Sequence, residues 1–277
     1  MADSQVFLGT MSSSESQKQL AIDQHSIQAD EFARRYRELE EDGYRSCFAY
    51  SRKRLAEMLD SYLPEQGDGL RLLDVGCGTG HHMASLRERG FEVAGVDGSS
   101  EMLDQARANN PGSDIRLADV EALPFADGSF DLVLCVEVLR YLPDSSRCIA
   151  ELARVLKPGG VCLATAAPIL NLNGYWLVNR AANLVRIGDL VRLKQFFASS
   201  RRLRSEFAGA GFMKPAVRGV YFGPINWVER LVPSALPRLL KAWEPVDKTI
   251  ADAPLFKEFS NMFLVHGVKM EGRIADR

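Results

Sequence analysis

Residues 72–80, which read LLDVGCGTG, constrain this chain more than any other stretch. An apolar run that stops at Gly76, Gly78 and Gly80 predicts a buried strand that enters a turn. Because glycine has no Cβ atom, such a turn can adopt positive φ and bring bare N–H groups close to a ligand. The helix predicted at about 81–89 points its N-terminus at the same place. A nucleotide site at this turn is our first hypothesis.

The spacing of the glycines narrows the kind of nucleotide. The dinucleotide fingerprint is G-x-G-x-x-G, whereas this chain reads G-x-G-x-G with Asp74 just before the first glycine. A nicotinamide-dependent dehydrogenase is therefore disfavoured.

Composition sets the class of protein. The chain has 277 residues, of which 46% are hydrophobic and 25% charged, enough for one large α/β domain with additions. A formal charge of −2 gives no general attraction to nucleic acid. The one basic run, at 201–204, has the pattern of the solvated face of a helix. We expect no nucleic-acid partner.

Cysteine and histidine patterns bear on redox state and metals. The five cysteines are scattered without a C-x-x-C pair, which predicts free thiols in a reducing compartment. The four histidines lack metal-ligand spacing, so no metal site is expected. The Ser-rich start carries no secretion signal pattern, and no run of about 18 apolar residues occurs. These features predict a cytoplasmic protein.

Two acids follow further predicted strands. Residues 92–97 form an apolar strand that ends in Asp97, where one carboxylate can accept from two ribose hydroxyls. The alternative is that Asp97 caps the next helix, but Ser99 or Ser100 can supply that cap. After a strand at 115–118, the Asp119 carboxylate and the next backbone N–H offer the acceptor and donor that adenine needs. Ordinary loop polarity is the alternative for Asp119.

These motifs together resemble the class I S-adenosylmethionine-dependent methyltransferases, in the group that acts on small molecules, quinones and lipids. The similarity lies in the glycine turn, in residues 118–131 (ADVEALPFADGSFD) and in residues 152–160 (LARVLKPGG). It covers about 45–165 specifically. The resemblance implies an α/β fold: a doubly wound, mostly parallel, seven-stranded Rossmann-like sheet with an antiparallel last strand, N-terminal helices and C-terminal helical insertions.

The predicted organisation has three parts. Residues 1–20 are expected to be a disordered tail, 21–66 a helical cap, and 67–277 the Rossmann-like domain that binds S-adenosylmethionine. Helical insertions are expected at about 168–200 and 224–258. For the second insertion four roles stay open: a lid over an apolar substrate, an oligomer interface, a peripheral membrane contact, or helices packed on the core.

The resemblance also assigns cofactor contacts residue by residue. Met102 would lie against the adenine, the Cys135 backbone carbonyl would accept from the ammonium group, and Tyr36, Tyr44 or Arg52 would reach the cofactor from the N-terminal helices. For the aromatic residues the alternative is plain core packing. The full set of cofactor-binding candidates is Tyr36, Asp74, Gly76, Cys77, Gly78, Gly80, Asp97, Gly98, Met102, Asp119, Val120 and Cys135.

The chain departs from the family beyond its fourth strand. Related enzymes carry a pattern near E-x-x-E-H-x-P-D, whereas residues 137–144 read EVLRYLPD, so Arg140 and Tyr141 replace the usual pair. Together with Tyr175 they are the catalytic candidates, by location alone. Glu137 is a further candidate on the same ground. Since the sulfonium activates its own methyl group, catalysis requires alignment of the acceptor more than a base.

The resulting hypothesis is in-line methyl transfer from S-adenosylmethionine to a small apolar or lipid-like molecule, by a monomer or homodimer. Two alternatives stay open. The first is intramolecular cyclisation of S-adenosylmethionine with release of methylthioadenosine, and the second is a non-catalytic protein that binds S-adenosylmethionine.

Overall fold

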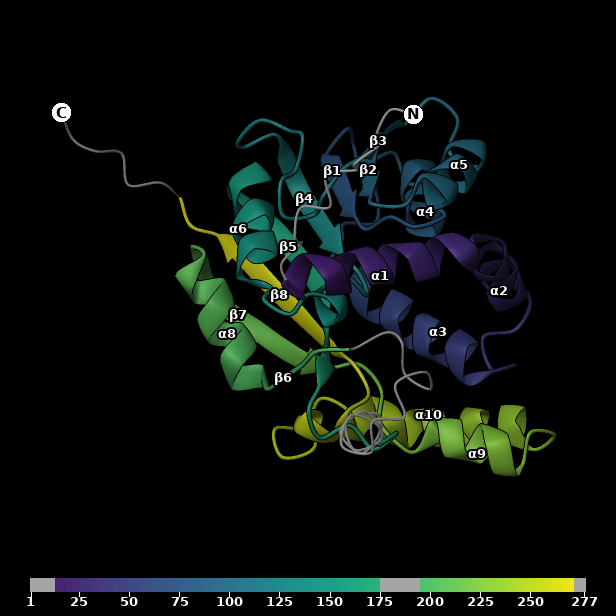
Figure 1. The fold of residues 1–277 in the computed structure, drawn as a ribbon. Helices are drawn as coiled ribbons and strands as arrows, with labels where there is room; N and C mark the ends of the chain where they lie inside the picture. Colours follow the sequence, from purple (N-terminus) through teal and green to yellow (C-terminus); the bar gives the residue numbers. More distant parts are fainter. Residues whose placement is uncertain (1–12, 175–194, 272–277) are drawn as a thin grey trace, which may run out of the picture.

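The computed structural model describes residues 13–174 and 195–271, which form one twisted sheet with helices on both faces (Figure 1). The strands run in the order β3-β2-β1-β4-β5-β8-β7, and β6 pairs beside β5. In the described residues the strands are β1 (Arg71–Val75), β2 (Glu92–Asp97), β3 (Asp114–Leu117), β4 (Phe130–Cys135), β5 (Leu156–Pro168), β6 (Phe197–Ala198), β7 (Phe212–Gly219) and β8 (Phe263–Lys269).

The strand directions confirm the predicted mostly parallel sheet, and the short strand β6 adds an eighth strand to the seven expected. β1 pairs in parallel with both β2 and β4, whereas β8 runs antiparallel to β5 and β7. β1 is thus the strand from which the chain winds outward both ways. In such sheets ligands bind beyond the carboxyl ends of the strands at this switch point, which is where the glycine turn follows Val75.

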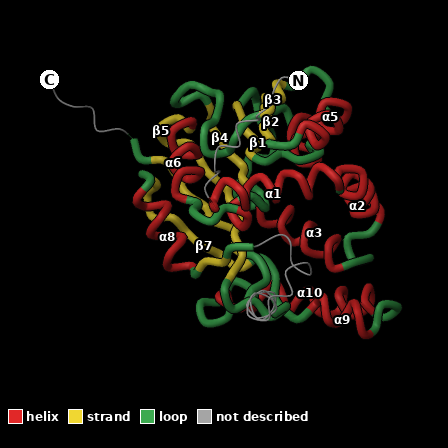
Figure 2. The backbone as a smooth tube through the Cα atoms, in the orientation of Figure 1, coloured by secondary structure: helices red, strands yellow, loops and turns green. Residues whose placement is uncertain are grey.

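Helices cover both faces of the sheet, and Figure 2 shows them in red around the yellow strands. The described helical segments are α1 (Ser13–Ile27), α2 (Ala29–Glu41), α3 (Cys47–Asp60), α4 (His81–Glu88), α5 (Ser100–Asn109), η1 (Leu139–Tyr141), α6 (Ser146–Val155), α8 (Ser200–Gly209), α9 (Ile225–Leu231), α10 (Leu236–Ile250) and η2 (Lys257–Phe259). The apolar sides of α3, α4 and α5 pack on one face, and those of α6 and α8 on the other.

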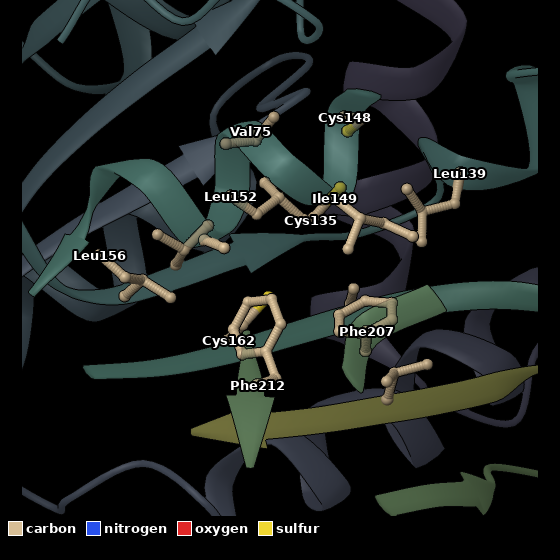
Figure 3. Packing of buried hydrophobic residues seen from close by; sticks show 14 of the residues in the cluster. Val75, Cys135, Leu139, Cys148, Ile149, Leu152, Leu156, Cys162, Phe207 and Phe212 are labelled. Carbon is tan, nitrogen blue, oxygen red and sulfur yellow. The ribbon is translucent and has the colours of Figure 1, made fainter. Parts of the chain in front are cut away.

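The alternation of side chains along β1 explains the two cores. Leu73 and Val75 belong to the cluster under α6 and α8, while Leu72 belongs to the cluster under α3 to α5, because successive strand residues point to opposite faces. Figure 3 shows the first cluster from close by, with Ile149 of α6 among its residues. Because β1 is held by both cores, the position of the glycine turn that follows it is fixed as well.

The N-terminal segment corrects one prediction. Helix α1 begins at Ser13, whereas a disordered tail was expected as far as residue 20. The local sequence is polar, so the helix depends on tertiary contacts: the Ser26 hydroxyl donates to the Ser99 hydroxyl over 2.8 Å. Figure 1 shows α1 lying across the body of the fold. The first part of the helical cap expected over 21–66 consists of α1 and α2, which are separated at Gln28.

The second insertion consists of α9, α10 and η2, and it is anchored to α3. Asp247 of α10 is fully buried and accepts hydrogen bonds from the Tyr50 hydroxyl (2.6 Å), from Arg54 Nε (3.1 Å) and from the Phe222 N–H (2.6 Å). Ile225 and two leucines of α10 pack on Tyr50. The sequence left four roles open for this insertion. This contact fits one of them, helices packed on the core.

Further expectations concern thiols and membrane helices. All five cysteines are buried and free, as their spacing predicted. Across 13–174 and 195–271, no helix combines the length and apolar character needed to cross a membrane. Tyr175 and most of the first predicted insertion lie outside the described residues.

Candidate functional site

The glycine turn after β1 forms the floor of the candidate site. Gly76, Gly78 and Gly80 have φ of +73°, +53° and +77°. A Cβ atom added to Gly76 would lie 2.2 Å from Val138 Cγ2, whereas one added to Gly78 would have only Met102 Sδ nearby, at 4.0 Å. Gly76 is therefore required by packing and by its backbone angle together, while Gly78 faces open space.

Asp97 holds this turn in place. Its Oδ2 accepts from the Gly78 N–H and its Oδ1 from the Ser99 N–H, both over 2.9 Å. The Ser99 hydroxyl accepts from the Met102 N–H over 3.1 Å, so Ser99 supplies the helix cap, as expected. Each carboxylate oxygen has two lone pairs, which leaves Asp97 with capacity for ligand hydroxyls.

Asp74 lies buried behind the turn. Its Oδ2 has no hydrogen-bond partner among the described residues. Burial raises the pKa of Asp74 to about 7, and the nearby Asp97 carboxylate adds to the rise. Burial raises the pKa of Asp97 as well. Two buried acids so arranged are stabilised in their ionised forms by a cation bound near them.

A cavity of about 190 Å³ opens above the turn. Most of the predicted cofactor-binding residues meet there. Those that line it are Tyr36, Gly76, Cys77, Gly78, Asp97, Gly98, Met102, Asp119 and Val120, joined by the catalytic candidate Tyr141.

Other predicted site residues lie elsewhere. Gly80 is the N-cap of α4, and the Cys135 side chain is fully buried in the core at the end of β4. Val136 and Glu137, which follow it, do line the cavity. Tyr44 packs against the cluster around Tyr50 and donates its hydroxyl hydrogen to Glu244 of α10. Packing was the alternative to cofactor binding for this residue.

Helix α1 supplies residues that sequence reasoning missed. Lys18, Ala21, Ile22 and His25 all line the cavity. Lys18 Nζ lies 2.5 Å from Asp119 Oδ2 and 2.6 Å from Glu121 Oε2, so the helix is tied across the predicted adenine end. The polar, Ser-rich sequence gave no periodic signal for this helix.

Two arginine side chains at the cavity share one carboxylate, that of Glu137. Glu137 Oε2 accepts from Arg140 Nη1 over 2.5 Å, and Arg52 Nη2 lies 3.5 Å from the same oxygen. Burial alone would raise the pKa of Glu137, but the charges of Arg140 and Arg52 outweigh it and lower that pKa to about 2. Glu137 also has φ of +63°, a costly conformation for a non-glycine residue.

Two tyrosines present aromatic rings to the cavity. Tyr36 stacks on His81 with a centroid separation of 4.3 Å, and Tyr141 meets the His25 ring edge-on at 4.9 Å. Aromatic faces attract cations with about 0.5–2 kcal/mol, so both rings suit a positively charged ligand.

Comparisons with known proteins agree with this geometry. A family described as "Methyltransferase domain" matches residues 73–164. The ubiquinone/menaquinone biosynthesis C-methyltransferase UbiE of Desulfotalea psychrophila is 34% identical, over 56% of this chain and 71% of that protein. The malonyl-[acyl-carrier protein] O-methyltransferase of Erwinia pyrifoliae is 36% identical, over 47% of this chain and 51% of that protein.

A solved structure shares the fold. A chain from the complex of the Haloferax volcanii Trm112 methyltransferase activator with a methyltransferase aligns over 89% of this chain and 98% of its own length, with 22% identity and a TM-score of 0.60. This chain spans about half or less of the length of several curated relatives. The chain belongs to the class I S-adenosylmethionine-dependent methyltransferases.

The residues present fit the cofactor of that family. S-adenosylmethionine carries a sulfonium and an ammonium group, which suit the ring faces of Tyr36 and Tyr141 and the Asp97 carboxylate in the cavity. Asp74, buried behind the turn with an unpaired Oδ2, adds a second acid nearby. It also carries a carboxylate, and Arg52 Nε and Nη1 are buried without partners among the described residues. Gly78 leaves space where a side chain would intrude. The cavity thus offers acidic, aromatic and basic groups for the charged groups of the cofactor.

Proposed function

We propose that this protein transfers a methyl group from S-adenosylmethionine to a small molecule with a lipid-like part. The observation that carries the proposal is that the glycine turn, Asp97 and Asp119 line one cavity at the switch point of the sheet, with the unpaired Asp74 buried behind the turn. When bound, S-adenosylmethionine supplies a methyl carbon that an acceptor lone pair attacks, while the carbon–sulfur bond breaks and its electron pair stays on sulfur.

The chain's own residues would bind and orient the two reactants. Asp97 and Asp119 would hold the ribose and the adenine, Arg52 the carboxylate, and Tyr36 and Tyr141 the positive charge. Alignment of this kind can contribute roughly 7–11 kcal/mol to lowering a barrier. Helix α1 lies over the cavity and would exclude water from it.

Proton transfer by Glu137 is not part of the proposal. A carboxyl whose pKa is about 2 is a poor base near neutral pH. Arg140, predicted as catalytic, contacts Glu137 and would position it. Tyr141 lines the cavity and remains a catalytic candidate; Tyr175 remains one by sequence alone.

A lipid-like acceptor is supported by the exposed apolar residues of the C-terminal helices. Trp227, Leu231 and Val232 on and after α9 are 44%, 77% and 43% exposed. Contiguous exposed apolar surface is common at binding sites.

The test is to incubate the full chain with methyl-labelled S-adenosylmethionine, alone and with cell extract, and to identify the products. Label transferred to an extract component together with S-adenosylhomocysteine is expected. Methylthioadenosine in its place would mean cyclisation or another displacement, and tight binding with no product from any extract would mean a binding protein. Either result would overturn methyl transfer.

A further inference from the structure

A second, larger cavity of about 590 Å³ lies beside the cofactor cavity, and no described residue lines both. Its lining comes from α2, α3, η1, α9 and the loops before β6 and β8. Four asparagines line it: Asn171, Asn173, Asn226 and Asn261. Such a wall suits the polar head group of a ligand rather than its hydrocarbon part.

The charged residues that line the second cavity are mostly positive. Four of the described lining residues are arginines, at 34, 35, 140 and 230, and two are glutamates, at 31 and 229. Glu31 is paired with Arg35, and Glu229 Oε1 accepts from the Cys47 N–H over 3.4 Å. The lining therefore carries an excess of positive charge.

Arg140 connects the two cavities. Its Nη1 donates to Glu137, which lines the cofactor cavity, and its Nη2 donates to Gln195 Oε1 over 2.7 Å in the second cavity. Its Nε is buried without a partner among the described residues. With Arg52, two guanidinium groups thus share the single carboxylate of Glu137, and the cluster has a net charge of +1.

A buried cation that lacks a full counter-charge favours an anionic ligand. The cofactor's carboxylate would satisfy Arg52, which lines the cofactor cavity. That leaves Arg140, which lines the second cavity, with an unpaired Nε as a donor for a second anion. We propose that the methyl acceptor binds in the second cavity through an anionic head group, a carboxylate or a phosphate, which Arg140 holds beside the donor site. This inference rests on the proposed methyltransferase function and specifies its substrate class as an anionic amphiphile.

Calorimetric titration of the full chain with octanoate, octyl phosphate and the neutral octanamide tests the head group. At least one of the two anions is expected to bind at least tenfold more tightly than octanamide, and the tighter of the two identifies the kind of head group. Equal affinity for octanamide, or no measurable binding of either anion, would overturn the proposal.

Variants assign that binding to the cavity. Arg140→Gln is expected to weaken anion binding at least tenfold. Asn173→Asp adds a negative charge and keeps the Oδ1 that accepts from the Asn226 N–H, so it should weaken binding similarly even if Arg140→Gln fails to fold. Arg201→Gln, on the exposed face of α8, is the matched control and should bind as the wild type does. Unchanged anion affinity in folded Asn173→Asp would contradict this location.

Binding of S-adenosylmethionine separates the two proposals. Arg52→Gln should weaken donor binding more than octanoate binding, whereas Arg140→Gln should weaken octanoate binding more than donor binding. Wild-type protein that binds octanoate but no S-adenosylmethionine would overturn the proposed function alone. Wild-type protein that binds the donor but neither anion would overturn only the anionic acceptor.

Discussion

The two cavities differ in how their residues are distributed along the chain. Apart from α1, Phe32, Tyr36 and Arg52, the cofactor cavity draws on short segments between 76 and 142, most of them at the end of a strand or the start of a helix. The second cavity draws on residues from 31 to 261, most of them in loops and in the added helices. A site built at strand ends has a recognisable sequence pattern, whereas a site built between additions does not. The predictions below test whether the two cavities also behave separately.

Glu137→Gln tests the side chain between the two cavities and should have the largest effect. The change leaves the Arg52 and Arg140 guanidinium groups buried without their shared carboxylate. Loss of one partner from a buried ion pair destabilises a protein by about 3–5 kcal/mol. Urea denaturation would measure this loss, with the exposed Glu65→Gln as control. A change below about 1 kcal/mol would mean that the two arginines do not depend on Glu137.

Gly76→Ala should damage the cofactor cavity through the fold itself. Its φ of +73° costs an alanine about 1–2 kcal/mol, and overpacking against Val138 adds about 1–3 kcal/mol. Gly112→Ala is the matched control, because it has φ of +81° and no atom within 4 Å of the added Cβ. In thermal unfolding, the midpoint temperature of Gly76→Ala should lie well below that of Gly112→Ala. Equal decreases in the two midpoints would contradict the packing argument.

Asp97→Ala should affect the cofactor cavity without reaching the second one. Loss of a charged hydrogen-bond partner should weaken S-adenosylmethionine binding by about 1.5–3 kcal/mol, as measured by calorimetry. Octanoate binding should not change. Asp104→Ala, whose side chain is 78% exposed on α5, is the control. An unchanged donor dissociation constant would remove the ribose assignment.

Asp74→Asn should change the pH dependence of stability by a smaller amount. Folded Asp74 keeps its proton up to a pKa of about 7, against 3.8 without the fold. Between those pH values Asp74 is ionised in the unfolded chain but protonated in the folded chain. The free energy of unfolding therefore falls as the pH rises. Relative to the wild type, Asp74→Asn should therefore gain about 1 kcal/mol of unfolding free energy per pH unit.

Urea denaturation of both proteins at pH 5 and pH 6.5 measures that difference directly. Burial lowers the pKa of His82 to about 3, which makes stability rise with pH. Because wild type and variant both contain His82, its contribution cancels in the difference between them. If the two proteins differ in unfolding free energy by the same amount at both pH values, Asp74 is not buried with an unpaired oxygen.

Much of the cofactor site could be predicted from sequence, for a local reason. The turn angles at Gly76 and Gly78, the Asp97 carboxylate and the Ser99 cap all depend on residues within a few positions of a strand end. The role of Lys18 could not be predicted, because its helix is held by contacts with Asp119 and Glu121 about a hundred positions away. Neither could the pairing of Arg52 with Glu137.

The amino-acid sequence by itself determined the glycine turn, the acids beside it and the strands and helices that flank them, because backbone angles and side-chain periodicity act over short range. Only the tertiary structure decided that α1 covers the cofactor cavity, that α10 is fastened to α3 through Asp247, and that Arg140 stands between two cavities. Those features depend on burial and charge pairing between segments far apart in the chain, and the energies involved exist only once the segments have been brought together.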